Sequence, residues 1–376
     1  MKKREKGTIV YKDMKSKRES NIELLRIAAM LMIIVYHIYA HCVDGQLNNG
    51  IYTAFNNVGF YKKLFILDAI APFGKIGNAV FIMISGYFMI LKETKINLGK
   101  TAKKLLLQMG FAAVLLTIIP PVVLLFVDGI KISVLNINVF NEMSWFAGYY
   151  FMIIVFAGIF FNKYLNELDK VQYVGLLLVL FAITQFSWTC SLLENLAKGL
   201  STFITGVFLY GLGGFIQKYN PFEKIRGYIW VLAIIAAFVL IFISNYNLYL
   251  QDLQNYNGTD LFKRSILRYH DSYFIPILVG VSLFELFRRV RIPNSKIINF
   301  MGGATFMVYL LHDNVFAYSI WATQDWIDLL YSNPYLYMVK HLAWAMAVFG
   351  IGMIGYAVYL LIGWLSPRCI KIVVKS

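Results

Sequence analysis

The first hydrophobic stretch, residues 21–41, constrains the fold most, because it is apolar and yet holds an arginine near one end and two histidines near the other. A hydrocarbon core about 30 Å thick takes roughly 20 apolar residues in a helix, so the stretch is long enough to cross a bilayer. Ionisable side chains in such a helix are costly and usually face a protein interior or a water-filled cavity. The stretch therefore predicts a transmembrane helix with a functional face.

The ionisable residues of this helix share one face. Arg26 and His37 are eleven positions apart, which is about three turns and roughly 16 Å along the helix axis. His41 follows one turn later, and Glu23 stands one turn before Arg26. The two histidines have the spacing of zinc-binding helices, but no acidic motif such as HExxH accompanies them. We therefore expect no metal at this position.

Charge gives the helix a direction. Residues 1–20 hold eight lysines or arginines and three acidic residues. By the positive-inside rule, this tail is expected to be cytoplasmic. Arg26 would then lie near the cytoplasmic face and His37 in the outer half of the membrane. One helical face would thus hold an anion-binding cation inside and a proton-transfer group outside.

Composition indicates an all-α integral membrane protein. Hydrophobic residues make up 59% of the chain and charged residues only 15%, and the mean hydropathy is +0.63. The net charge of +15 does not indicate nucleic acid binding, because the basic residues stand in short stretches between apolar spans. They are better explained by topology and by contact with anionic membrane lipid.

We expect about ten transmembrane helices. An even number places both termini in the cytoplasm. The chain would then divide into a basic tail (1–20), one membrane domain (21–366) and a short C-terminal tail (367–376). The expected spans are residues 22–41, 69–91, 103–126, 145–162, 171–190, 199–217, 227–245, 272–287, 297–320 and 338–365.

Several short motifs occur in a fixed order along the chain. Glu23, Arg26 and His37 form the first. The others are Phe81-x-x-x-Ser85-Gly86-Tyr87, a basic stretch over 92–104, Trp145-Phe146 and Tyr309-x-x-His312. This order resembles the membrane-bound acyltransferase family three, the multi-spanning O-acyltransferases that modify bacterial cell-surface glycans. Several motifs in the right order across most of the chain are more specific than one chance pair.

The resemblance implies an acyltransferase, by preference an O-acetyltransferase, in the plasma membrane of a bacterium. The donor would be cytoplasmic acetyl-CoA or another acyl-CoA, used as a substrate, and no bound cofactor is expected. The acceptor would be a hydroxyl of a capsule, an exopolysaccharide or another cell-surface polysaccharide. A complex with other proteins of glycan biosynthesis would suit such a role.

His37 is the leading candidate for the catalytic acid–base residue. A neutral imidazole can accept the proton of a sugar hydroxyl that attacks a thioester, and can then return it to the leaving thiolate. Arg26 would contact the donor phosphates, or would pair with Glu23 at the inner interface, and both can hold together. We take His37, Arg26 and Glu23 as the catalytic group.

The remaining candidates concern the binding of the donor and the acceptor. Near Ser85 and Gly86 the small side chains could admit the donor arm or serve helix packing. The lysines that would bind the donor phosphates with Arg26 are Lys100, Lys103 and Lys104. By resemblance, acceptor or supporting roles fall to Trp145, Tyr149, Tyr309 and His312.

Three points stay open from the sequence. Asp313 directly follows His312, and adjacent residues of a helix do not face each other, so no pairing of the two is required. Lys75 is ionisable, lies near the outer start of the second span and has no assigned role. A rival function is export of a polysaccharide or a lipid-linked glycan, which the absence of an inverted sequence repeat disfavours.

Overall fold

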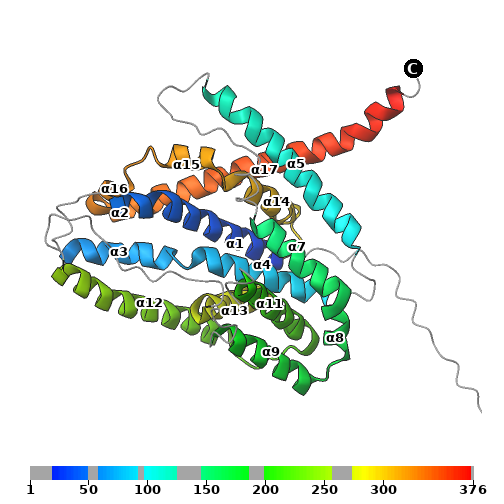
Figure 1. Cartoon of the computed structure of the whole chain (residues 1–376), viewed down its shortest axis with the longest axis horizontal. Helices are drawn as coiled ribbons and strands as arrows, with labels where there is room; N and C mark the ends of the chain where they lie inside the picture. Colours follow the sequence, from blue (N-terminus) through cyan, green and yellow to red (C-terminus); the bar gives the residue numbers. More distant parts are fainter. Residues whose placement is uncertain are drawn as a thin grey trace, which may run out of the picture.

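The computed structural model describes residues 19–49, 58–91, 97–124, 145–185, 199–255 and 273–373, and these residues form helices and short turns without a strand (Figure 1). The basic tail and part of the basic stretch 92–104 lie outside the described residues. The helices, with η for π-helical turns, are α1 (Ser20–Ile38), η1 (Tyr39–Val43), α2 (Asp44–Asn49), α3 (Val58–Ile70), α4 (Phe73–Met89), α5 (Leu98–Leu124), α7 (Trp145–Phe156), η3 (Ala157–Phe161), α8 (Asn162–Glu167), α9 (Lys170–Gln185), α11 (Leu200–Tyr219), α12 (Gly227–Asn255), α13 (Phe274–Arg289), α14 (Lys296–His312), α15 (Val315–Trp321), α16 (Trp326–Ser332) and α17 (Pro334–Val373).

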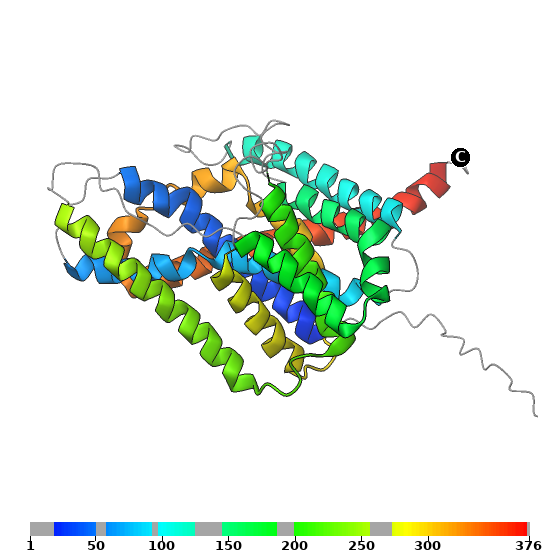
Figure 2. The same ribbon diagram turned by 60° about the horizontal axis from the view of Figure 1, so that its bottom comes forward.

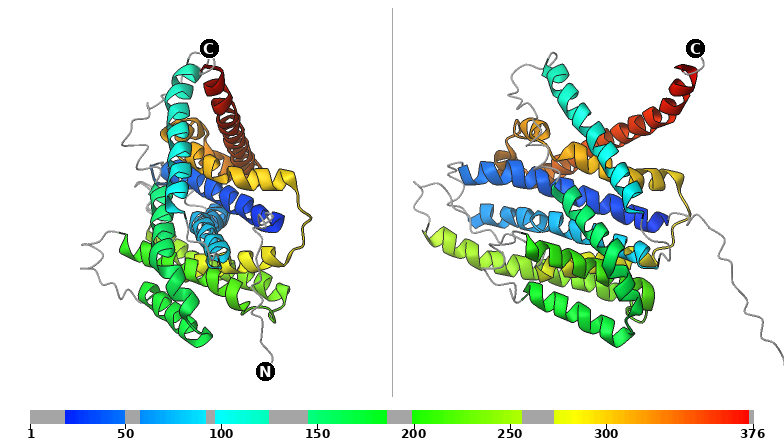
Figure 3. Two further views of the ribbon diagram at one scale, coloured as in Figure 1. Left: turned by 90° about the vertical axis from the view of Figure 1, so that its right-hand side faces the viewer. Right: turned by 45° about the vertical axis from the view of Figure 1, so that its right-hand side comes forward.

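Helices α1 and α4 lie side by side at the centre of the bundle. α14 and α17 pack against α1, whereas α11 and α13 pack against α4. Figure 2 brings α12 to the front, outside α13. In Figure 3 the upper ends of α5 and α17 project beyond the other helices. The first hydrophobic stretch of the chain is therefore surrounded by protein, as its ionisable residues require.

Glycines allow α4 and α11 to touch through their backbones. A Cβ atom on Gly86 would lie 1.9 Å from the carbonyl oxygen of Tyr210. A Cβ on Gly213 would lie 2.1 Å from the carbonyl oxygen of Met83. Because any larger residue would force these backbones apart, the glycines of this crossing serve close helix packing.

Seven helical segments are long and apolar enough to cross a membrane, among the residues that the structure describes. They are Ser20–Leu47, Lys62–Met89, Leu98–Val123, Trp145–Glu167, Leu200–Tyr219, Gly227–Leu248 and Pro334–Leu365. The other three expected spans coincide with α9, α13 and α14, which have only 16, 16 and 17 residues. The chain is a helical membrane protein, while the count of ten spans and the side of the termini stay predictions.

The expected ninth span, 297–320, is wrong as one continuous helix. α14 ends at His312, and Asp313 and Asn314 leave the helical conformation with ψ angles of 77° and 157°. The Asn314 side chain then caps α15 by accepting a hydrogen bond from the backbone N–H of Ala317 at 2.9 Å. Asparagine favours such a cap because its side chain replaces a missing backbone acceptor. This break gives His312 and Asp313 different orientations.

Basic residues are concentrated at one end of the bundle. Hydrogen bonds there join the start of α1 to the end of α13 and to α14, and the end of α4 to α8. Basic side chains of this region include Lys218, Lys224, Arg226, Arg288, Arg289, Arg291 and Lys296. The positive-inside rule expects such an end to face the cytoplasm.

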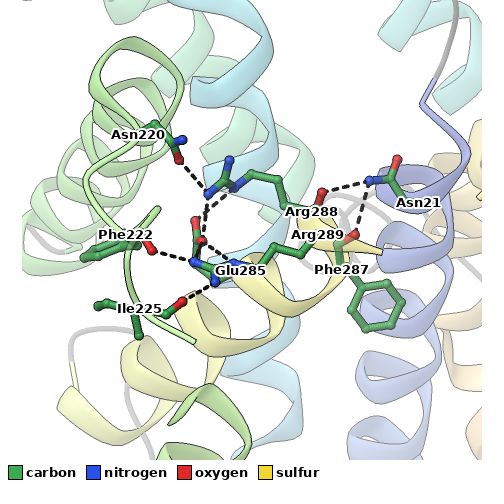
Figure 4. Close-up of polar contacts among 8 residues, drawn as sticks. All are labelled: Asn21, Asn220, Phe222, Ile225, Glu285, Phe287, Arg288 and Arg289. Atoms are coloured by element: carbon green, nitrogen blue, oxygen red, sulfur yellow. Dashed lines mark hydrogen bonds and ion pairs between the residues drawn. The ribbon is translucent and has the colours of Figure 1, made fainter. Parts of the chain in front are cut away.

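Glu285 forms ion pairs with two arginines at this basic end (Figure 4). Its buried carboxylate lies 2.8 Å from Nη2 of Arg288 and 2.9 Å from Nη2 of Arg289. Arg288 also donates to the side-chain oxygen of Asn220 at 2.8 Å, and Arg289 donates to the carbonyl oxygen of Phe222 at 2.6 Å. The cluster therefore joins α13 to the turn between α11 and α12.

We expect Glu285→Ala to destabilise the protein by about 3 kcal/mol, because it leaves two arginines without their buried counter-charge. Glu223→Ala is the matched control, since Glu223 is exposed on the same turn and its loss should change stability by less than about 0.5 kcal/mol. The melting temperatures of the wild type and of both variants are measured in detergent, with size-exclusion chromatography as the readout of folded protein. Equal melting temperatures would contradict the role given to Glu285.

Candidate functional site

One face of α1 connects two cavities. The first, here called the arginine cavity, has a volume of about 440 Å³ and is lined by Arg26, Met30 and Ile33. The second, the histidine cavity, has about 370 Å³ and is lined by Ile33, His37 and His41. These residues of α1 and η1 recur at helical spacing, so a single stripe passes from one cavity to the other.

Three buried side chains separate the cavities. Ile33, Phe146 and Tyr309 line both of them. The backbone N–H of Phe146 donates to the hydroxyl oxygen of Tyr309 at 3.3 Å, which ties the first turn of α7 to α14. We call this trio the collar. The two cavities therefore adjoin at the collar.

The arginine cavity is cationic at its rim. Lys100 and Lys104 of α5 line it together with Arg26. Nη1 of Arg26 lies 3.4 Å from Oε1 of Glu23, so the expected pairing of these two residues is present. Lys103 does not line the cavity, because one residue along an α-helix is a turn of about 100°.

Ser85 lines the arginine cavity, whereas Gly86 does not. The Ser85 hydroxyl donates to the carbonyl oxygen of Phe81 at 3.0 Å and lies 3.1 Å from the hydroxyl of Tyr150, which also lines the cavity. Gly86 instead faces the backbone of Tyr210, as described above. Of the two interpretations open for this pair, cavity lining fits Ser85 and helix packing fits Gly86.

Three histidines, an aspartate and a tyrosine meet beside the histidine cavity, and all of them except His312 line it. Nδ1 of His37 lies 2.9 Å from Nε2 of His312 and 3.4 Å from Oδ1 of Asp313. Nε2 of His41 lies 3.9 Å from the same carboxylate oxygen. Tyr318 donates its hydroxyl proton to Asp313, and its ring stacks on His41 with centroids 4.0 Å apart. His312 and Asp313 are almost fully buried.

Hydrogen bonding fixes the tautomers of the neutral histidines. Nδ1 of His312 lies 2.8 Å from the carbonyl oxygen of Tyr309, and a carbonyl oxygen only accepts, so this nitrogen holds the proton. Nε2 of His312 is then an acceptor, and His37 must donate to it from Nδ1. The proton-free nitrogen of His37 is therefore Nε2, the atom available to act as a base.

The break after α14 makes this arrangement possible. In a continuous helix, His312 and Asp313 would point about 100° apart, and only one of them could reach His37. Because Asp313 leaves the helical conformation, both side chains reach the same nitrogen of His37. Sequence reasoning missed Asp313 as a partner of His37. The one available signal was Asn314, a helix-capping residue next to it.

The two aromatic candidates of α7, Trp145 and Tyr149, have different surroundings. Trp145 lines the histidine cavity, with its ring centroid 5.8 Å from Nζ of Lys75. Lys75 and Asn78 of α4 also line this cavity, which gives a location to the lysine that the sequence left unassigned. Tyr149 lines neither cavity. Its hydroxyl instead donates to the carbonyl oxygen of Thr202 at 3.1 Å, which joins α7 to α11.

His37, His41 and Asp313 also have the composition of a metal site. Each offers one ligand atom, and these atoms lie within 4.8 Å of one another. Two imidazoles and a carboxylate suit a zinc ion. The Nδ1 atom of His37 is also hydrogen-bonded to His312. The cluster therefore has the composition of an acid–base site as well as that of a metal site.

A family model, described as an acyltransferase domain, matches residues 19–364. No curated protein and no solved structure is significantly similar to the chain. The match begins directly before α1 and ends within α17, so it contains both cavities and all of the motifs quoted from the sequence. The chain therefore belongs to acyltransferase family 3 and is a membrane acyltransferase.

Proposed function

We propose that the protein is an O-acetyltransferase that moves an acetyl group from cytoplasmic acetyl-CoA to a hydroxyl of an extracytoplasmic cell-surface polysaccharide. The observation that supports it most directly is the stripe of α1 that links a cationic cavity to a histidine cavity. The basic end of the bundle and the positive-inside rule favour a cytoplasmic arginine cavity. The protein would then act across a bacterial plasma membrane.

The donor would enter from the arginine cavity. Arg26, Lys100 and Lys104 supply three positive charges at its rim for the phosphates of acetyl-CoA. The pantetheine arm would extend through the collar and bring the thioester to His37. Arg26 and His37 stand about 16 Å apart along the helix, a length that an extended arm spans. The acetyl group would cross the membrane while the nucleotide stayed inside.

The acceptor would enter the histidine cavity. Nε2 of His37 takes the proton from the sugar hydroxyl as its oxygen attacks the thioester carbonyl. The carbon–sulfur bond then breaks, and the proton passes from His37 to the thiolate, giving an ester and CoA. The Asp313 carboxylate stabilises the imidazolium that forms in between.

The developing oxyanion also needs a partner. Lys75 and Asn78 stand one turn apart on α4 and line the histidine cavity with His37. An ammonium and an amide there would stabilise negative charge on the carbonyl oxygen.

The test is proton NMR of the surface polysaccharide from the wild-type strain, a deletion strain and a complemented strain. We expect the deletion to lose O-acetyl signals and the complemented strain to regain them, with equal amounts of polymer at the surface. The signals also identify the acyl group and the sugar position.

The same measurement examines the rival function. If the protein exported a glycan, the deletion strain would retain polymer inside the cell, and the polymer that reached the surface would keep its acyl groups. That result would overturn the proposed transferase activity.

A further inference from the structure

The side-chain amide of Gln108 is buried, and within the described part of the chain nothing donates a hydrogen bond to its oxygen. The side chain lies on α5, lines the arginine cavity, and is only 2% exposed. Its Oε1 atom has no hydrogen-bond partner among the described residues. An unpaired buried acceptor of this kind costs about 1–3 kcal/mol. Because Gln108 lines a cavity, a molecule bound there can supply the missing donor.

The position of Gln108 indicates which part of a bound ligand it would contact. Lys100, Lys104 and Gln108 recur every four residues and all line the arginine cavity, so they form a stripe on α5. Gln108 lies about 12 Å along the helix from Lys100. The stripe therefore offers two cations at one end and a buried amide at the other.

A phosphopantetheine thioester has its groups in the same order. Its phosphates come first, two secondary amides follow, and the thioester is at the end. Each secondary amide has one N–H, which is the donor that Oε1 of Gln108 lacks. The side-chain amide of Gln108 can also donate to the neighbouring carbonyl of the arm.

We infer that Gln108 positions the donor by hydrogen bonding to an amide of its pantetheine arm. This inference rests on the proposed function and deepens it, because it specifies which part of the donor is recognised. Gln108 is a positioning residue in this account, since it holds the arm and touches no reacting atom.

Gln108→Leu tests the inference with two donors. The full chain in nanodiscs is given acetyl-CoA or acetyl-pantetheine, which lacks the nucleotide, with polysaccharide from the deletion strain as acceptor. We expect the KM to rise about 10-fold for both donors. Arg26→Ala should raise the KM for acetyl-CoA alone, because acetyl-pantetheine has no phosphate.

Stability separates this role from a structural one. Removing an unpaired buried amide should leave the melting temperature equal or higher, so binding and stability would change in opposite directions. Asn245→Leu is the matched control. Asn245 is also a buried amide, 1% exposed and without partners among the described residues, but it lines neither cavity. Its KM values should not change.

An unchanged KM, a rise with acetyl-CoA alone, or a lower melting temperature would each overturn the role of Gln108. Gln108→Met replaces Gln108→Leu if the leucine variant does not fold. If the wild-type protein transferred no acetyl group from either donor, the proposed function would fail, and this inference with it.

Discussion

Replacing His37 with alanine is expected to lower kcat for acyl transfer by about 10²- to 10⁴-fold, the usual contribution of a general acid–base group. The KM for acetyl-CoA should change little, because His37 lies in the histidine cavity and Arg26 in the other. The measurement is transfer of radiolabelled acetyl from acetyl-CoA to polysaccharide of the deletion strain, with purified variants in nanodiscs.

Two further variants show whether the base itself is required. His37→Gln keeps a hydrogen-bonding side chain near His312 and Asp313, but it cannot take up a proton, so it should be as inactive as His37→Ala. His41→Phe keeps a ring stacked on Tyr318 and should retain most of the activity. Activity in His37→Gln, or equal losses in the His37 and His41 variants, would contradict the role given to His37.

Asp313→Asn is expected to lower kcat by about 10²-fold or more without raising the KM for acetyl-CoA. The carboxylate lies 3.4 Å from Nδ1 of His37, where it orients the ring and stabilises the imidazolium. Asparagine has nearly the same shape but no charge, and it can donate to His37, which would favour the wrong tautomer. Steady-state kinetics in nanodiscs separate the effect on kcat from that on KM.

Asp68→Asn is the control for loss of a buried carboxylate. Asp68 is 0% exposed on α3 and lines neither cavity. Its substitution is expected to leave kcat within a few-fold of the wild type. An Asp313→Asn enzyme with wild-type kcat, or an Asp68→Asn enzyme with the same loss, would show that the contact between Asp313 and His37 has no catalytic function.

The helical periodicity of α1 made the centre of the site predictable. Because α1 is regular from Ser20 to Ile38, the spacing of Arg26 and His37 was sufficient to place them on one face. The motif residues Ser85, Trp145 and Tyr309 also line a cavity. For these residues, the local sequence determined the face of the helix that each side chain occupies.

The orientation of the other side chains depends on how each helix is turned about its own axis when it packs against its neighbours. The sequence could not distinguish Lys103 from Lys104, or Tyr149 from Trp145, because the rotation of α5 and α7 is set by packing with distant helices. The break at Asp313 interrupts an apolar pattern that reads as one span. Gln108 looked like any polar residue in a helix, and only its burial and its unpaired oxygen distinguish it.

The most direct test uses inverted membrane vesicles that enclose polysaccharide from the deletion strain. Radiolabelled acetyl-CoA is added outside, where the cytoplasmic face is exposed. We expect label on the enclosed polymer with the wild-type protein and almost none with His37→Ala. Label confined to polymer on the same side as acetyl-CoA, or equal labelling with His37→Ala, would contradict transfer from the arginine cavity to the histidine cavity.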